Sequence, residues 1–265
     1  MTIEVTILGC GSSGGVPLIG NIWGPCDPND IRNTRRRVSI LVKIKSKTFL
    51  IDTSPDLRMQ MLDAKVKNMD AVLYTHSHAD HVHGIDDLRM IVFNMRKRVN
   101  VWADAKTQEA LLQKFGYTFI QVEGSPYPPI LEMSTINGQF SIGGPGGEIT
   151  FNPFEVQHGT ITSLGLRIDD VTYIPDISAM NEIAWDQIKK TNIWILDALR
   201  RTPHQSHTHL SQSLEWIKKS GVEKGILTNM HIDMDYETLL NELPSNVEPA
   251  YDGMSLASSH NAVTK

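Results

Sequence analysis

Two series of short apolar segments, rich in β-branched residues and bounded by turn residues, follow one another along the chain. They predict strands at 3–8, 38–44, 48–51, 71–74 and 99–103, and again at 149–157, 164–168, 171–174, 193–196 and 225–228. Apolar residues at helical spacing predict helices after Pro55, Thr75–His81, Asp104, Ala184, Ser211 and Asp235. This alternation favours an α/β fold with helices outside the sheets, in one domain over residues 1–254, followed by a polar tail at 255–265.

The strand at 71–74 runs directly into the sequence H-x-H-x-D-H, formed by His76, His78, Asp80 and His81. Imidazole and carboxylate groups are common ligands of Zn(II), and they also suit Mn(II) and Fe(II). Four such groups on one tight loop cannot all converge on a single ion, but alternate positions can face two neighbouring ions. A solvated histidine-rich turn is the alternative, and further ligands at other strand ends argue against it.

Three potential ligands stand singly at later strand ends, namely His158, Asp176 and His231. Each alone is more often a structural residue, but sites in layered α/β folds form where strand ends gather. We therefore expect two divalent ions per chain. Their expected ligands are His76, His78 and His158 for one ion, Asp80, His81 and His231 for the other, and Asp176 as the bridge between them. A hydroxide between the ions would be the nucleophile.

Asp52 is a polar residue at the end of a buried strand, so it needs a partner, and holding a metal-ligating histidine would supply one. The loop at 9–17 is rich in glycine, and its backbone amides could hold a phosphate or simply connect two elements. Arg35 and Arg36 follow that loop, and they could bind phosphate or lie exposed at a strand entry.

The composition indicates where the protein is located and which classes of partner it binds. The chain has 265 residues, of which 40% are hydrophobic and 21% charged, with a formal net charge of −5. It has no apolar run long enough for a transmembrane helix, no secretory signal and only two cysteines, so we expect a cytoplasmic protein without a membrane partner. No Lys or Arg occurs from Phe115 through Leu166, which disfavours an arm that grips a large nucleic acid. The sequence is compatible with a homodimer.

The H-x-H-x-D-H motif, with single His, Asp and His residues at later strand ends, resembles the metallo-β-lactamase superfamily over almost the whole chain. That resemblance implies a four-layer αββα sandwich with a dinuclear site at one edge. The opening Gly-Cys-Gly-Ser-Ser-Gly-Gly-Val-Pro, the bridging Asp176 and the segment Ser206–Leu210 are similar to the phosphodiesterase branch, nearest to the 5-phosphoribosyl 1,2-cyclic phosphate phosphodiesterases.

In that branch a histidine from the loop before the penultimate strand reaches the active site. The resemblance implies His207 for this place, as general acid or phosphoryl clamp, with His209 as the second candidate. It also implies a catalytic role for Asp80. A cysteine cluster that forms a structural zinc site in the branch is reduced here to Cys26 beside Asp27, so we expect no such site.

The resulting hypothesis is a metal-dependent phosphodiesterase acting on a small cyclic or nucleotide-like phosphodiester. A thioester or lactone hydrolase on the same scaffold is the second enzyme hypothesis, because one fold hosts many reactions. A non-catalytic nucleotide- or metal-binding protein is the third. The complete set of potential ligands argues against it.

Overall fold

The first of two sheets carries the H-x-H-x-D-H motif. The computed structural model describes residues 2–144 and 146–259. Seven strands in the order β14-β1-β2-β3-β4-β5-β6 form this sheet, in which β3 to β6 are parallel. Their bounds are β1 (Thr2–Gly9), β2 (Ser39–Ile44), β3 (Lys47–Ile51), β4 (Ala71–Leu73), β5 (Val99–Ala103), β6 (Leu131–Thr135) and β14 (Ser255–Ser259).

The second sheet also has seven strands, in the order β13-β12-β11-β10-β9-β8-β7. Strands β7 to β10 pair antiparallel, whereas β10 to β13 are parallel. Their bounds are β7 (Phe140–Ile142), β8 (Ile149–His158), β9 (Ile161–Ile168), β10 (Val171–Ile174), β11 (Ile193–Asp197), β12 (Lys224–Thr228) and β13 (Val247–Pro249). Because parallel strands end at the same edge, the segments after β10, β11 and β12 meet there.

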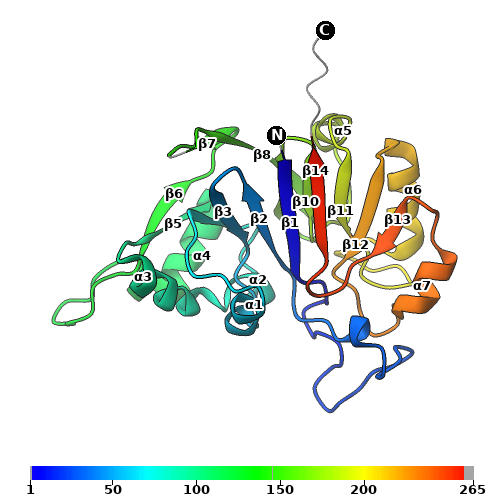
Figure 1. Ribbon diagram of the computed structural model, residues 1–265, viewed down its shortest axis with the longest axis horizontal. Coiled ribbons are helices and arrows are strands. Elements are labelled where there is room, and N and C mark those ends of the chain that lie inside the picture. Colours follow the sequence, from blue (N-terminus) through cyan, green and yellow to red (C-terminus); the bar gives the residue numbers. More distant parts are fainter. Residues whose placement is uncertain (1, 145, 260–265) are drawn as a thin grey trace, which may run out of the picture.

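Helices cover the outer faces of both sheets (Figure 1). The first sheet is covered by α1 (Leu57–Asp63), α2 (Ala79–Val82), α3 (Leu88–Met95) and α4 (Ala105–Phe115), and the second by α5 (Glu182–Ile188), α6 (Leu210–Ser220) and α7 (Tyr236–Glu242). Short 3-10 helices lie at Ile31–Asn33, Ile85–Asp87 and Gly116–Thr118. One apolar core lies between the sheets, where Phe49 meets Phe151, and a second core contains Leu50, Leu88 and Leu111. The predicted αββα sandwich is confirmed.

Several boundaries differ from the sequence prediction. Residues 255–259 are not part of a polar tail: they form β14, which pairs antiparallel with β1 and buries Leu256 opposite Val5. Small polar side chains hid this edge strand, and the remaining tail residues, 260–265, lie outside the described residues. Helix α6 begins at the buried Leu210, with His209 rather than Ser211 as its N-cap residue.

Strands β6, β7 and β13 are additional to the strands that the sequence predicts. No helix among the described residues is long and apolar enough to cross a membrane.

Candidate metal centre

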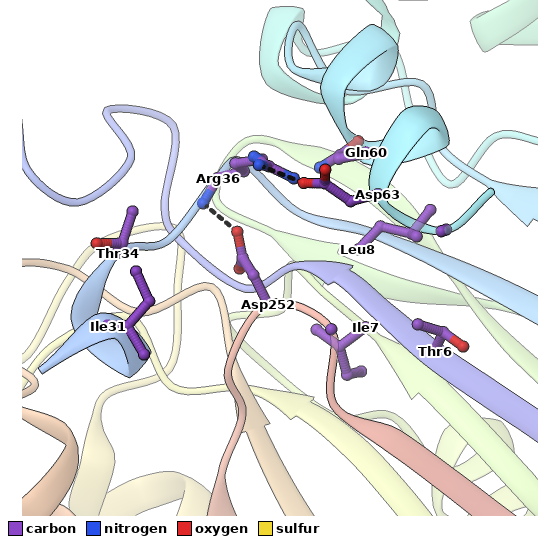
Figure 2. A pocket seen from close by; sticks show the side chains of 11 residues that line it. Thr6, Ile7, Leu8, Ile31, Thr34, Arg36, Gln60, Asp63 and Asp252 are labelled. Atoms are coloured by element: carbon purple, nitrogen blue, oxygen red, sulfur yellow. Dashed lines mark hydrogen bonds and ion pairs between the residues drawn. The ribbon is translucent and has the colours of Figure 1, made fainter.

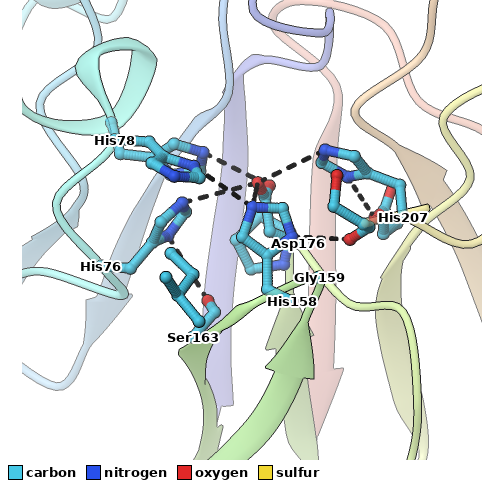
Figure 3. A network of polar contacts seen from close by, with 12 residues as sticks. His76, His78, His158, Gly159, Ser163, Asp176 and His207 are labelled. Carbon is cyan, nitrogen blue, oxygen red and sulfur yellow. Dashed lines mark hydrogen bonds and ion pairs between the residues drawn. The ribbon is translucent and has the colours of Figure 1, made fainter. Parts of the chain in front are cut away.

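The H-x-H-x-D-H loop leaves β4 and enters α2, so that His76 and His78 precede the helix while Asp80 and His81 lie in its single turn. His76, His78, His158 and Asp176 each offer a ligand atom, and these atoms all lie within 4.8 Å of one another. His158 is the last residue of β8, and Asp176 follows β10. Figure 3 shows His76 and His78 on one side of Asp176 and His207 on the other.

The two carboxylate oxygens of Asp176 face two different groups of side chains. Oδ2 of Asp176 is 3.5 Å from His76 Nε2 and 3.3 Å from His158 Nε2. Oδ1 lies 3.3 Å from His81 Nε2, and that nitrogen is 3.6 Å from Asp80 Oδ2. One buried carboxylate therefore lies between two sets of potential ligands, as a bridging residue would.

The donor atoms fit a divalent cation. The Nε2 atoms of His76 and His81 are buried and have no hydrogen-bond partner among the described residues. Such unpaired buried nitrogens are costly in an apolar interior unless something binds them. In two of the candidate ligands the other ring nitrogen, Nδ1, already has a partner. His81 Nδ1 is 2.7 Å from Asp52 Oδ2, and His158 Nδ1 donates to the Ser206 carbonyl at 2.6 Å. Carbonyl and carboxylate partners of this kind are typical of metal-binding histidines.

The expected role of Asp52 as the partner of a histidine is confirmed. Asp52 is completely buried, and it accepts hydrogen bonds from the backbone and the hydroxyl of Thr75 as well as contacting His81. The Asp52 backbone has a positive φ of 63° directly after β3, a left-handed conformation that Asp adopts more readily than most residues.

The pKa shifts of His76 and Asp176 favour the protonation states that metal ligands need. Burial holds the pKa of His76 well below its usual range, so its ring is neutral and can bind a cation. Burial alone would raise the pKa of Asp176, but the imidazoles around it, foremost His81, hold that pKa well below its ordinary value. Asp176 is therefore ionised, which is the form a bridging ligand needs.

His207 lies beside this cluster, on the segment between β11 and α6. Its Nδ1 is 2.8 Å from Asp197 Oδ2, its Nε2 is 4.0 Å from Asp176 Oδ2, and its ring centroid is 4.6 Å from that of His158. Burial disfavours the charged ring, but the adjacent Asp197 carboxylate raises the pKa of His207 to about 9. At neutral pH this imidazole carries a proton on each nitrogen.

His209, the second candidate, is the N-cap residue of α6, and its ring makes no hydrogen bond, ion pair or ring contact with the cluster among the described residues. His231 follows β12, and 37% of its side chain is exposed. Its Nδ1 is 3.3 Å from Asp233 Oδ1, so its Nε2 is free to bind an ion, but no contact joins the His231 ring to the cluster among the described residues. The assignment of His231 as a ligand stays a prediction.

The suggested phosphate contacts of Arg35 and Arg36 are not supported. Arg35 is 2% exposed and donates to the carbonyl of Met234 at 2.6 Å, so it is a structural residue inside the protein. Its Nη1 also lies 3.9 Å from the sulfur of buried Cys26. Arg36 pairs with Asp63, and its backbone amide donates to Asp252, in a separate pocket of the protein (Figure 2).

Two residues near the centre were missed as site residues. Asp197 is the last residue of β11 and orients His207. Asn229 has a positive φ of 61° directly after β12, and its amide donates to Asp176 Oδ1 and to the Pro175 carbonyl, each at 3.1 Å. Both stand at the end of a parallel strand, as Asp176 does, and that position was the available signal.

Comparison with known proteins places the chain among metal-dependent enzymes. The model of the beta-lactamase superfamily domain matches residues 47–232. A crystal structure of a diphosphatase from the PhnP family superposes with a TM-score of 0.87 at 33% sequence identity, covering 97% of this chain and 98% of that one.

Two curated relatives match in sequence. A Porphyromonas gingivalis protein named octanoyltransferase is 31% identical over 256 residues, which are 94% of this chain, so the chain spans about half the length of that relative (50%). Ribonuclease Z of Clostridium kluyveri is 28% identical over 94 residues, or 35% of this chain and 26% of that protein.

Proposed function

Because the chain belongs to the beta-lactamase superfamily and to its PhnP branch, we propose that this metal-dependent hydrolase is a dinuclear phosphodiesterase. Its proposed substrate is a small cyclic or nucleotide-like phosphodiester. The observation that supports the proposal best is the position of Asp176, whose two oxygens face different histidines while His207 stands beside it. The diphosphatase named above acts on phosphoric anhydride by its name, which agrees with phosphoryl chemistry here.

The proposed ligands of one ion are His76, His78 and His158, and those of the other are Asp80, His81 and His231, with Asp176 shared. Divalent ions in such a site supply Lewis acidity and make a water molecule nucleophilic at neutral pH. Zn(II) and Mn(II) both suit these ligands, and Fe(II) fits them as well. Asp52 and Ser206 fix the rings of His81 and His158, so the ligand nitrogens need little rearrangement when an ion binds.

His207 is the proposed general acid. The Asp197 carboxylate accepts the hydrogen bond from His207 Nδ1. The second ring proton, on Nε2, then points toward Asp176 Oδ2, which also faces the histidine cluster. As the bond from phosphorus to the leaving oxygen breaks, this proton would move to that oxygen and leave His207 neutral. The Asp197 carboxylate keeps the imidazolium available at neutral pH, because it raises the pKa of His207. Asp80 would act through the metal that it binds.

Acyl thioester hydrolysis is the second candidate, and one observation favours it. The relative named octanoyltransferase matches almost the whole chain, and octanoyl transfer by that name is acyl chemistry. Half of that protein lies outside the match, however, so its name does not locate its activity in the shared half.

A metal titration tests the proposal. The protein is stripped with a chelator, Mn(II) or Zn(II) is added stepwise, and hydrolysis of bis(4-nitrophenyl) phosphate and of an octanoyl thioester is followed in parallel. We expect phosphodiester cleavage that rises to a plateau near two ions per chain. Two bound ions with cleavage of the thioester alone would replace the phosphodiesterase by an acyl hydrolase, and a plateau at one ion would remove the dinuclear centre.

A further inference from the structure

A groove with a volume of about 500 Å³ opens next to the proposed metal centre, and the mechanism above does not use most of it. Asp80 and Ala79 of α2 line it, so it reaches the motif loop. The other walls come from the glycine-rich loop, from the segment Leu18–Ile22 and from Arg37. We call it the Arg37 groove.

Arg37 is held so that its terminal nitrogens stay free. Its backbone amide donates to Asp56 Oδ2 at 2.9 Å, and its Nε lies 3.0 Å from the same oxygen. The Gln60 side chain donates to the Arg37 carbonyl at 2.9 Å. Neither Nη1 nor Nη2 has a hydrogen-bond partner among the described residues, and 28% of the side chain is exposed. The guanidinium therefore presents two free donor groups beside the groove.

The glycine-rich loop adds donors of its own. Ser13 and Gly14 occupy the centre of a turn closed by the hydrogen bond from Gly15 to Ser12, at 2.8 Å, and both are exposed. Their backbone amides have no acceptor among the described residues. A Cβ added to Gly15, whose φ is +68°, would lie 4.0 Å from Arg37 Nη1, so the guanidinium passes over this turn. Amide groups of a turn together with a forked guanidinium are suited to a phosphate.

The opposite wall is apolar. Leu18 and Ile22 pair through two backbone hydrogen bonds, of 3.0 and 3.2 Å, and form a small hairpin that lines the groove. Ile19 at its tip is 98% exposed, and Ile22 is 52% exposed. Large aliphatic side chains this exposed beside a polar site provide a surface on which a flat ring can pack.

We propose that the Arg37 groove binds a second phosphate of the substrate and the ring attached to it, which makes nucleoside diphosphate esters the preferred class over simple cyclic monophosphates. The inference rests on the proposed phosphodiesterase function, since it assumes that the first phosphate sits at the metal centre. Arg37 and the turn amides hold the second phosphate, and the Leu18–Ile22 hairpin covers the ring.

Binding of two unreactive or product-like ligands to the metal-loaded protein tests this assignment. Calorimetry compares α,β-methylene-ADP with AMP for the wild type, for Arg37→Met and for Arg36→Met. The second variant is the matched control, because Arg36 pairs with Asp63 in another pocket. We expect the wild type and Arg36→Met to prefer the diphosphate by roughly tenfold or more, as for hydrogen bonds between charged groups, and Arg37→Met to lose that preference.

A wild type without preference for the diphosphate, or an Arg37→Met variant that keeps it, would overturn the assignment. Melting profiles check that the variants fold, and Arg37→Lys, which keeps the charge but not the fork, should retain only part of the preference. Hydrolysis of bis(4-nitrophenyl) phosphate by the wild type is measured separately. Its absence would count against the phosphodiesterase, whereas the binding ratio reports on the groove alone.

Discussion

The centre contains two pairs of histidine and aspartate that look alike but have different surroundings. His81 contacts Asp52 at 2.7 Å, and both side chains are completely buried. His207 contacts Asp197 at 2.8 Å, but 15% of its side chain is exposed. In both pairs the carboxylate holds Nδ1, which leaves Nε2 to face the cluster.

The free nitrogen distinguishes the two pairs. Nε2 of His81 lies between Asp80 and Asp176, at 3.6 and 3.3 Å, and no solvent reaches it. Nε2 of His207 is 4.0 Å from Asp176 and belongs to a side chain that solvent reaches. A nitrogen enclosed by carboxylates suits a cation, whereas a partly exposed imidazolium can give its proton to a substrate. The same pairing therefore supports a ligand in one place and an acid in the other.

Replacing His81 should have the largest effect. His81→Ala removes a proposed ligand and leaves the buried Asp52 without its imidazole, which costs roughly 3–5 kcal/mol for a broken buried pair. We expect fewer than two ions per chain by elemental analysis, no hydrolysis and a clearly lower melting temperature. His83→Ala is the control, since His83 is exposed and its ring packs edge-to-face on Phe115 rather than on the cluster. Unchanged metal content in His81→Ala would contradict the ligand assignment.

Replacing His207 should separate metal binding from catalysis. In His207→Ala both ions should remain, while hydrolysis slows by a factor of about 10² to 10⁴, as for loss of a general acid. Elemental analysis and initial rates measure the two quantities on one sample. His209→Ala is the comparison, and we expect a much smaller change from it. Full activity in His207→Ala, or the larger loss in His209→Ala, would move the role to His209.

Replacing Asp197 should shift the pH dependence rather than abolish activity. The acid form of His207 is present below its pKa of about 9 and is lost as the pH rises through that value. Asp197→Asn removes the carboxylate that raises this pKa, so the loss of activity should begin at lower pH, with a rate about tenfold or more below wild type near pH 9. A pH profile of kcat/KM with an unchanged alkaline limb would exclude this role of Asp197.

Much of the proposed centre could be predicted from the sequence because its candidate ligands stand in a recognisable local order. The H-x-H-x-D-H motif lies within one loop, and His158 and Asp176 each end a strand with clear apolar composition. The need of a buried carboxylate for a partner also led correctly from Asp52 to a histidine of the motif.

Contacts between distant segments were not predictable in the same way. Asp197 looked like any other polar residue at a strand end, and only the folded loop at 198–209 brings His207 back to it. Arg35 and Arg37 are neighbours in one basic run, yet one is buried against Met234 and the other lines the groove. Pairing between the two ends of the chain likewise hid β14, because its polar residues gave no strand pattern without β1 beside them.

Another carboxylate, Asp252, is half-buried and has no imidazole partner among the described residues, and its replacement should have the smallest effect. Burial raises the pKa of Asp252 to about 7, although the amides of Cys10 and Arg36 donate to it. Because the folded-state pKa lies above the unfolded one, the folded protein binds the extra proton, and stability falls as the pH rises through 7. Between pH 6 and 8 the free energy of unfolding should drop by about 1 kcal/mol, or roughly 2 °C in melting temperature. In Asp252→Asn the slope should be smaller by this amount, whatever the absolute stability of the variant. Asp197, whose pKa burial also raises to about 7, contributes to the slope of both proteins. An equal slope in both proteins would show that Asp252 is ionised in the fold at pH 6, as Asp176 is among its histidines.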